Sequence, residues 1–261
     1  MSFSSGSSPS IDMTDQERFA IAKQSLDSSH LRYNIGTYME RSQHLLLKLF
    51  YEPDISYHEV PFEGYIADIL NNDGITEIQT VGFRALHDKL TVFLPHYPVR
   101  VVFPVDTKNR ICWIDPDSGE STYSRLATYK KERYKILPEL LHISDMFGCS
   151  GLSVELASMS VSTHKLLDGY GKDRKRRATK KDVVPEELIE ITVLRNSDDI
   201  RDLLPFEKGQ QLTSKEIGEA LGLNRRKLWM AIKFLCITEV LIQVDKKGNS
   251  IIYEMTPYGY E

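Results

Sequence analysis

Apolar and polar residues alternate with two different periods along this chain, and the periods predict its main elements. Between residues 59 and 80, two short apolar runs are separated by the sequence Asn71–Gly74. Asn-Asp-Gly favours a tight turn because these residues tolerate the backbone angles that a hairpin needs. We therefore predict a strand, a turn and a strand. Asp68 lies in the first strand, and Glu77 and Gln79 share one face of the second.

Helical spacing precedes and follows this hairpin. Residues 38–50 place an apolar stripe on one side of a helix, with Glu40 in its first turns. The stripe consists of Leu45, Leu46, Leu49 and Phe50. Residues 83–90 have an amphipathic helical pattern, residues 99–105 form an apolar run typical of a strand buried on both faces, and residues 111–114 predict the next strand. The predicted order is helix, strand, strand, helix, strand.

The last 65 residues carry a second pattern. A short helix is predicted at residues 197–204, before a proline. Thr213 and Glu216 have the spacing of a capping box, which opens a second helix. Gly222 ends that helix, and Asn224 can cap a third. Apolar runs at 240–244 and 251–253 then predict a hairpin with a basic tip.

The middle of the chain is less clearly patterned. Residues 129–141 are predicted to be helical, and residues 152–167 and 188–194 have the alternation of strands. Between those strands, residues 171–181 hold seven basic residues and one acid, a net charge of +6. This run is either the loop of a long hairpin or a linker between domains. Concentrated basic charge is typical of phosphate binding, and it is also found in solvated loops.

Composition narrows the class of protein. Of 261 residues, 41% are hydrophobic and 27% are charged, and the net charge is −4, so the chain as a whole is not a basic nucleic-acid coat. No apolar run has the length of a membrane span, and the Ser-rich start lacks a signal-like pattern, so we expect a cytoplasmic protein that contacts no membrane. The three cysteines form no CxxC pair, so neither a zinc site nor a disulfide framework is indicated.

Asp68 and Glu77 are the residues on which a chemical hypothesis depends. The predicted turn brings both carboxylates to one strand pair. Anionic oxygen ligands with open water positions suit a hard divalent cation, Mg²⁺ or Mn²⁺. Such a metal can activate water against a phosphodiester.

The motif of Asp68, eight intervening residues and Glu77-Ile78-Gln79 resembles the signature of the PD-(D/E)xK nuclease superfamily. Ala67 precedes the aspartate where that signature has proline, and Gln79 replaces its lysine. The predicted element order is also similar to the superfamily core, over residues 30–116. The resemblance implies an α/β fold, with a restriction-endonuclease-like mixed sheet flanked by helices.

The same resemblance implies roles for particular side chains. Glu40, Asp68, Glu77 and Gln79 would form the catalytic set, with the three acids as metal ligands. Gln79 would hydrogen-bond the attacking water, although an amide cannot take its proton. Lys89 or Lys48 could supply the missing cation, Arg84 could contact phosphate, and His44 could face the site one turn after Glu40.

The C-terminal pattern of three helices and a hairpin resembles the winged helix-turn-helix. In that family the second helix of the motif enters the major groove of DNA, and many members instead mediate protein contacts. The resemblance places Asn224, Arg225, Arg226 and Lys227 near bases, and Lys246 and Lys247 near phosphates. Arg174, Lys175, Arg176 and Arg177 of the basic run would add phosphate contacts that are blind to sequence.

These predictions divide the chain into a disordered tail (1–28), a nuclease-like domain (29–147), a connecting segment (148–196) and an α+β winged helix domain (197–261). Three functional hypotheses follow. The first is a metal-dependent DNA endonuclease, a phosphodiester hydrolase directed by its winged helix. The second is a DNA-binding regulator whose nuclease-like domain is inactive. The third is a protein-interaction adaptor. DNA is the expected partner, and a homodimer stays open.

Overall fold

The computed structural model describes residues 13–30, 42–80, 82–170, 177–248 and 250–257. Within these ranges the protein is mixed α/β, as expected. A large mixed sheet has the strand order β1-β2-β3-β4-β7-β8, with two short strands, β5 and β6, pairing with β4. A second, three-stranded sheet has the order β10-β11-β9. Among the described helices, none has the length and apolar character needed to cross a membrane.

The predicted hairpin forms the second and third strands of a three-stranded antiparallel meander. It consists of β1 (His58–Phe62), β2 (Tyr65–Asn71) and β3 (Gly74–Ile78). β1 was not anticipated as a separate strand. Gly74 has a φ of +120°, and a Cβ at this position would lie 2.3 Å from the Pro98 carbonyl oxygen. Glycine is therefore required for β3 to approach the chain entering β4 so closely.

A helical crossover follows β3. The 3₁₀ helix η2 (Phe83–Ala85) leads into α3 (Leu86–Phe93), and β4 (Val99–Ile114) then pairs in parallel with β3. The strand predicted at residues 111–114 is wrong as a separate element, because it is the continuation of β4. The polar stretch between the two apolar runs stays in the sheet, and a register shift between Asp106 and Lys108 absorbs the irregularity.

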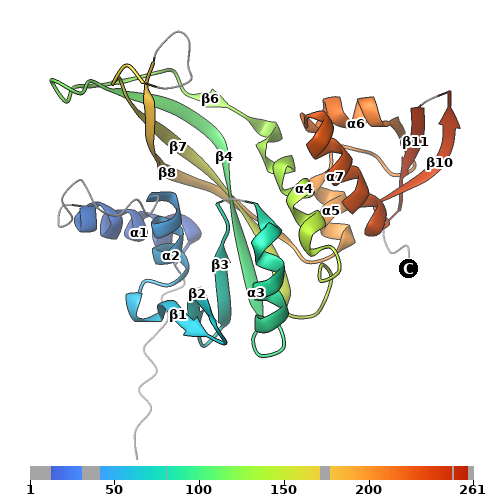
Figure 1. Ribbon diagram of the computed structural model, residues 1–261, viewed down its shortest axis with the longest axis horizontal. Coiled ribbons are helices and arrows are strands. Elements are labelled where there is room, and N and C mark those ends of the chain that lie inside the picture. The colour runs from blue at the N-terminus through green and yellow to red at the C-terminus, as the bar shows by residue number, and fades with distance from the viewer. Residues whose placement is uncertain (1–12, 31–41, 81, 171–176, 249, 258–261) are drawn as a thin grey trace, which may run out of the picture.

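The segment expected to connect two domains supplies the other long strands. β7 (Leu152–Leu166) is parallel to β4, and β8 (Thr179–Leu194) is antiparallel to β7. The described part of the basic run, residues 177–181, therefore lies at the end of this hairpin connection and in the first residues of β8. Together with β5 (Ser121–Tyr123) and β6 (Ala127–Thr128), these strands extend past the helices at the upper left of Figure 1.

Helices cover both faces of the large sheet (Figure 1). On one face, α1 (Asp15–His30) and α2 (Ser42–Tyr51) bury an apolar cluster against residues such as Val102 and Ala157. The expected disordered tail is therefore wrong from Asp15 onward. Phe19, Ala22 and Leu26 recur at helical spacing and are buried under α2, while residues 1–12 lie outside the described ranges.

The opposite face carries α3, followed along the chain by η3 (Lys130–Lys135), α4 (Ile136–Leu140) and η4 (Leu141–Ile143). The C-terminal unit packs beside α4. It comprises α5 (Ser197–Leu203), β9 (Gln211–Thr213), α6 (Ser214–Leu221), α7 (Arg225–Ile237), β10 (Leu241–Lys247) and β11 (Ser250–Met255). One continuous core joins this unit to the sheet, and the rings of Phe147 and Phe234 meet across the boundary at 5.4 Å.

Candidate active site and nucleic-acid interface

The predicted carboxylate pair lies where β2 and β3 diverge. The backbone pairing of the two strands includes Ile69 with Thr76, and the next residues along are Asp68 and Glu77. At this point the backbone N–H groups of Asp68 and Ile78 donate to side-chain carboxylates and not to carbonyl oxygens of the neighbouring strand. The Asp68 N–H donates to Glu77 Oε1 at 3.3 Å, and the Ile78 N–H donates to Asp68 Oδ2 at 2.7 Å. Both side chains are therefore fixed in the gap between the strands.

Lys89 of α3 supplies a cation at this gap. Its Nζ donates to Glu77 Oε2 at 2.8 Å and to the Ile66 carbonyl oxygen at 2.8 Å. The Glu77 side chain is fully buried and the Lys89 side chain is 24% exposed, so the ion pair lies just beneath the protein surface. Lys48 was the alternative. It donates to Glu59 at 2.5 Å, so the geometry favours Lys89 as the cation of the carboxylate pair.

His44 approaches the same site from the first turn of α2. Its Nε2 lies 3.2 Å from Asp68 Oδ2. Glu40, expected one turn earlier, lies outside the described residues. Gln79 follows the end of β3, and its N–H donates to the Val102 carbonyl at 2.8 Å, which keeps the chain aligned with β4.

The two carboxylates differ in pKa because their neighbours differ. Burial and, next, the nearby charge of Asp68 raise the pKa of Glu77 to about 7, with Lys89 offsetting part of their effect. Burial also acts to raise the pKa of Asp68. The hydrogen bond and charge of His44, with the Ile78 N–H, outweigh that effect and hold this pKa below its usual range. Asp68 is therefore the charged partner at neutral pH, while Glu77 is close to its titration point.

Within the described ranges, no cluster of three or more His, Cys, Asp and Glu side chains is arranged to hold a metal ion. The two carboxylates still fit a hard cation in chemistry, because they offer anionic oxygens. The raised pKa of Glu77 indicates negative charge that the surrounding protein compensates only in part. The site thus holds two of the three acids expected as metal ligands, and the third, Glu40, lies outside the described residues.

The C-terminal unit has the caps that the sequence predicted. The Thr213 hydroxyl accepts from the Glu216 N–H, and the Glu216 carboxylate accepts from the Thr213 N–H, which forms the capping box of α6. Gly222 ends α6 with a φ of +66°. Asn224 Oδ1 accepts from the Lys227 N–H and caps α7. Asn224 therefore has a structural role that occupies the side chain expected to reach DNA bases.

The basic residues at the start of α7 differ in their freedom. Arg225 and Arg226 are exposed, whereas the Lys227 Nζ lies 3.9 Å from Glu139 Oε1 of α4. Lys246 and Lys247 are exposed at the end of β10. The cations of η3 are largely engaged in the protein. Arg133 pairs with Glu190, Lys135 pairs with Glu132, and Lys131 donates to the Glu219 carbonyl.

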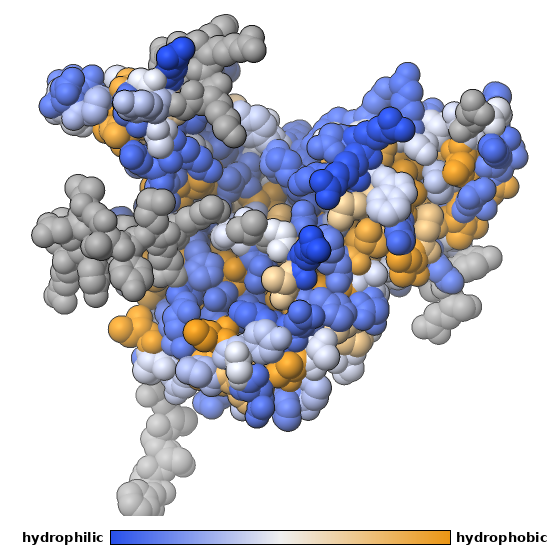
Figure 2. Space-filling view, in the orientation of Figure 1, coloured by the Kyte–Doolittle hydropathy of each residue, from blue (hydrophilic) through white to orange (hydrophobic). Residues whose placement is uncertain are grey.

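An apolar groove adjoins α7 on the side of the hairpin. Its cavity of about 520 Å³ lies between α7 and β10–β11, and Trp229, Ile232 and Cys236 are among its lining residues. Trp229 is 62% exposed. Figure 2 shows hydrophobic and strongly hydrophilic surface side by side over this unit.

Comparison with known proteins places the large sheet in a family. Residues 41–195 match the family described as "Domain of unknown function (DUF8091)". The chain belongs to the DUF8091 family. The family domain begins next to α2 and ends directly after β8, so the β7–β8 hairpin is part of the same domain as the carboxylate site.

The DUF8091 protein is also similar to an uncharacterized protein from Treponema pallidum (strain Nichols). The two are 26% identical over 230 residues, which is 86% of this chain and 89% of the relative. The alignment covers more residues than precede α5, which begins at Ser197. The similarity therefore extends into the C-terminal unit. No solved structure matches the chain.

The basic run of this DUF8091 domain is described only in part. Arg174, Lys175 and Arg176 lie outside the described residues, and Arg177 is exposed. Sequence reasoning could not choose between Lys89 and Lys48. A usable signal was the position of Lys89 on the helix directly after the Glu77 strand, because a crossover helix packs back over the strand that it leaves.

Proposed function

We propose that this protein is a metal-dependent DNA endonuclease of the PD-(D/E)xK type, directed to DNA by a winged helix. The observation that carries the proposal is the convergence of Asp68, Glu77 and Lys89 where β2 and β3 diverge. The superfamily signature requires two carboxylates and a lysine, and it places all three on a pair of strands. Here the lysine comes from α3, and Gln79 stands at the signature position.

The arrangement of elements supports the same proposal. α2 precedes an antiparallel hairpin, and α3 connects that hairpin to a strand parallel to its second member. This is the order expected for a restriction-endonuclease-like core. In the C-terminal unit, β9 joins β11, and the β10–β11 hairpin follows α7 directly, as a wing follows the reading helix.

Asp68 and Glu77 would hold Mg²⁺ or Mn²⁺, with Glu40 as a further ligand. When bound, such a metal supplies an activated water and neutralises charge on the scissile phosphate. The protein's own residues have separate tasks. Lys89 holds Glu77 in place and offers a positive charge beside it. Gln79 can orient a water through hydrogen bonds but cannot accept its proton.

The winged helix would direct the domain to DNA. Arg225 and Arg226 are the exposed side chains at the start of α7, and they could contact bases in the major groove. Lys246 and Lys247 at the wing, and the run Arg174–Arg177, would contact phosphates. Lys227 would have to leave Glu139 to take part.

The test is a cleavage assay on plasmid and linear DNA with Mg²⁺ or Mn²⁺. We expect Asp68→Asn and Glu77→Gln to abolish cleavage and Lys89→Met to reduce it strongly, with folding retained. The matched control is Asp106→Asn, which removes another half-buried carboxylate of the same sheet and should leave cleavage unchanged. Cleavage by Asp68→Asn at the rate of the parent protein would show that the site assignment is wrong.

A DNA-binding regulator with an inactive nuclease-like domain is the second candidate. Two observations favour it. Glu77 is fully buried with both carboxylate oxygens hydrogen-bonded, and Gln79 replaces the lysine of the signature. A parent protein that binds duplex DNA but cleaves none with either metal would support this function instead.

A further inference from the structure

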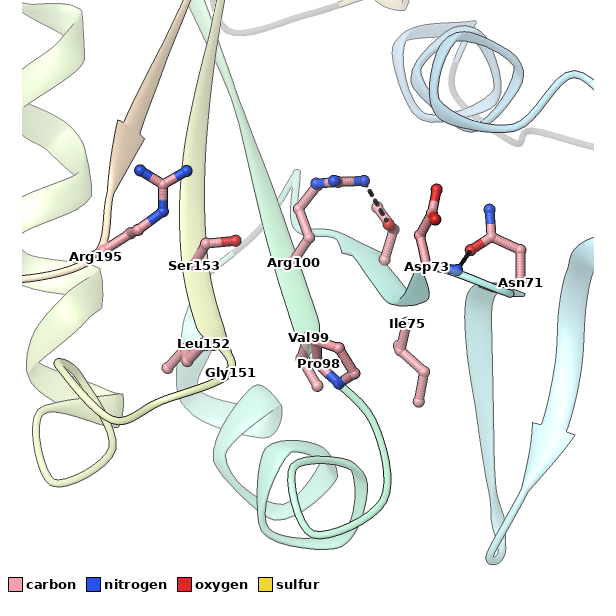
Figure 3. A pocket seen from close by; sticks show the side chains of 11 residues that line it. Asn71, Asp73, Ile75, Pro98, Val99, Arg100, Gly151, Leu152, Ser153 and Arg195 are labelled. Carbon is pink, nitrogen blue, oxygen red and sulfur yellow. Dashed lines mark hydrogen bonds between the residues drawn. The ribbon is translucent and has the colours of Figure 1, made fainter.

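A pocket of about 240 Å³ opens beside the turn of the β2–β3 hairpin (Figure 3), and neither Asp68 nor Glu77 lines it. It lies at the amino ends of the parallel strands β3, β4 and β7, where Pro98 and Gly151 form part of its wall. None of the roles discussed above uses this pocket.

Hydrogen-bond donors from three neighbouring strands meet in the pocket. Arg100 comes from β4, Ser153 from β7, and Arg195 from the residue after β8. Figure 3 shows Arg100 and Arg195 on either side of Ser153. Among the described residues, the Ser153 hydroxyl and the Arg195 guanidinium have no protein hydrogen-bond partner, and Arg195 is exposed to solvent. Two arginines and a hydroxyl that line one solvent-open cavity, on neighbouring strands and in cross-strand register, suit an oxyanion.

Arg100 is held rigidly for such a role. Its Nε donates to Glu155 Oε1 at 2.9 Å, and its NH1 lies 3.4 Å from Thr76 Oγ1. The Tyr51 hydroxyl donates to the other Glu155 oxygen at 2.6 Å, and the Tyr51 ring covers the guanidinium at 5.2 Å. A guanidinium fixed in this way loses little entropy when it binds a ligand.

The charge balance limits which oxyanion fits. Asp73 also lines the pocket, and Glu155 already pairs with Arg100, so two acids offset the two arginines. A dianion such as inorganic phosphate would meet repulsion from Asp73. A phosphodiester carries a single negative charge and gives up less hydration when it binds. The backbone of a nucleic acid is therefore the better match.

We propose that Arg100, Ser153 and Arg195 bind one phosphodiester of a DNA strand, outside the cleavage site. The inference rests on the proposed DNA-directed function. Asp68 lies three residues before Asn71 at the pocket edge, which is about 10 Å along β2. The three donors lie further across the sheet, on β4, on β7 and directly after β8, so the held phosphate is not the one at the carboxylates.

The experiment measures DNA binding in EDTA, so that cleavage plays no part. Fluorescein-labelled 30-mer duplex and single strand are titrated with the full-length protein by anisotropy. Arg195→Gln is the test variant, because Arg195 is exposed and its side chain holds no element in place. Ser153→Ala is a second variant, and Arg125→Gln, another exposed arginine, is the matched control.

We expect Arg195→Gln to weaken binding about four- to sixfold at 0.15 M salt and to flatten the slope of log affinity against log salt by about 0.7–0.9, the effect of one lost phosphate contact. Equal affinities for Arg195→Gln and Arg125→Gln would overturn the proposal. So would binding of inorganic phosphate that depends on Arg195 while DNA affinity stays unchanged. If the parent protein cleaves no DNA in the cleavage assay, the nuclease function is rejected. The loss of binding in Arg195→Gln would still support the phosphate site.

Discussion

At the scale of single residues, the sheet contains carboxylates whose burial opposes their charge. Glu77 offsets that cost through Lys89, and Asp106 through a hydrogen bond from Gln43 at 2.7 Å. The two cases predict different behaviour. Removing the cation of a buried ion pair destabilises the fold, because it leaves an uncompensated charge. A carboxylate that is bound to a neutral amide can be replaced by an isosteric amide without such a loss of stability.

Lys89→Met should destabilise the metal-free protein by about 1–3 kcal/mol at pH 8, below the value for a fully buried pair because Lys89 is partly exposed. The loss should shrink toward pH 5, because Glu77 takes up a proton when its cation is absent. The double variant Lys89→Met/Glu77→Gln should recover most of the stability. Urea unfolding at both pH values measures this cycle, and strictly additive losses would contradict the ion pair.

Asp106→Asn should stabilise the protein at neutral pH. Burial raises the pKa of Asp106, and the Gln43 hydrogen bond offsets this only in part. A raised folded-state pKa means that the stability contribution is complete below the ordinary value of 3.8 and is lost as pH rises. We expect Tm to rise by about 1–3 °C at pH 7 and the gain to vanish near pH 4.

The control for that measurement is Asp115→Asn. Hydrogen bonds from the Ser118 and Asp117 N–H groups lower the pKa of Asp115, so this change should give no stabilisation at neutral pH. A gain of equal size in both variants would point to a general charge effect on a protein of net charge −4.

At the scale of elements, α1 is the part that sequence reading missed. A Ser-rich start and a weakly apolar helix gave little periodic signal. Phe19 nevertheless packs edge-on against Phe50 of α2, with ring centroids 6.3 Å apart, and is buried. The helix is thus held by tertiary contacts, because its own amphipathic pattern is weak.

Phe19→Ala should therefore lower the free energy of unfolding by about 3–5 kcal/mol. Ile21→Ala on the same helix is the matched control. Ile21 is 45% exposed, so its loss should stay within about 0.5 kcal/mol. Denaturant unfolding followed by circular dichroism measures both, and a neutral Phe19→Ala would mean that α1 does not dock in solution.

At the scale of the whole molecule, the C-terminal unit is joined to the family domain by a shared core. Phe147 and Phe234 meet face to edge, Lys131 donates to the Glu219 carbonyl, and α4 packs along α7. The start of α7 thus lies against the family domain, so DNA at Arg225 and Arg226 would also lie close to η3. The C-terminal unit is therefore fixed relative to the family domain.

A shared core predicts one cooperative unfolding transition for the full chain. Phe234→Ala should lower the single Tm by several degrees without splitting it, because a large core truncation costs about 3–5 kcal/mol. Trp229→Ala, on the exposed side of the same helix, should leave Tm nearly unchanged. Two calorimetric peaks, with only one shifted by Phe234→Ala, would show that the units unfold independently.

The amino-acid sequence by itself determined the elements whose signals are local. The turn at Asn71–Gly74 and the caps at Thr213 and Asn224 were all predictable, because each depends on residues within a few positions. The capping of α7 also shows the limit of such reading. The sequence predicted that Asn224 caps α7, and it also predicted that Asn224 contacts DNA bases. The cap uses the side-chain oxygen of Asn224, which the second prediction did not take into account.

The tertiary structure alone decided what depends on distant partners. It joined residues 99–114 into one strand, because β7 pairs along the whole length. It placed the basic run in a hairpin of the family domain, and it brought Lys89 rather than Lys48 to Glu77. Strand pairing and ion pairing between residues far apart in sequence leave no periodic trace, since each residue's own neighbours are compatible with several partners.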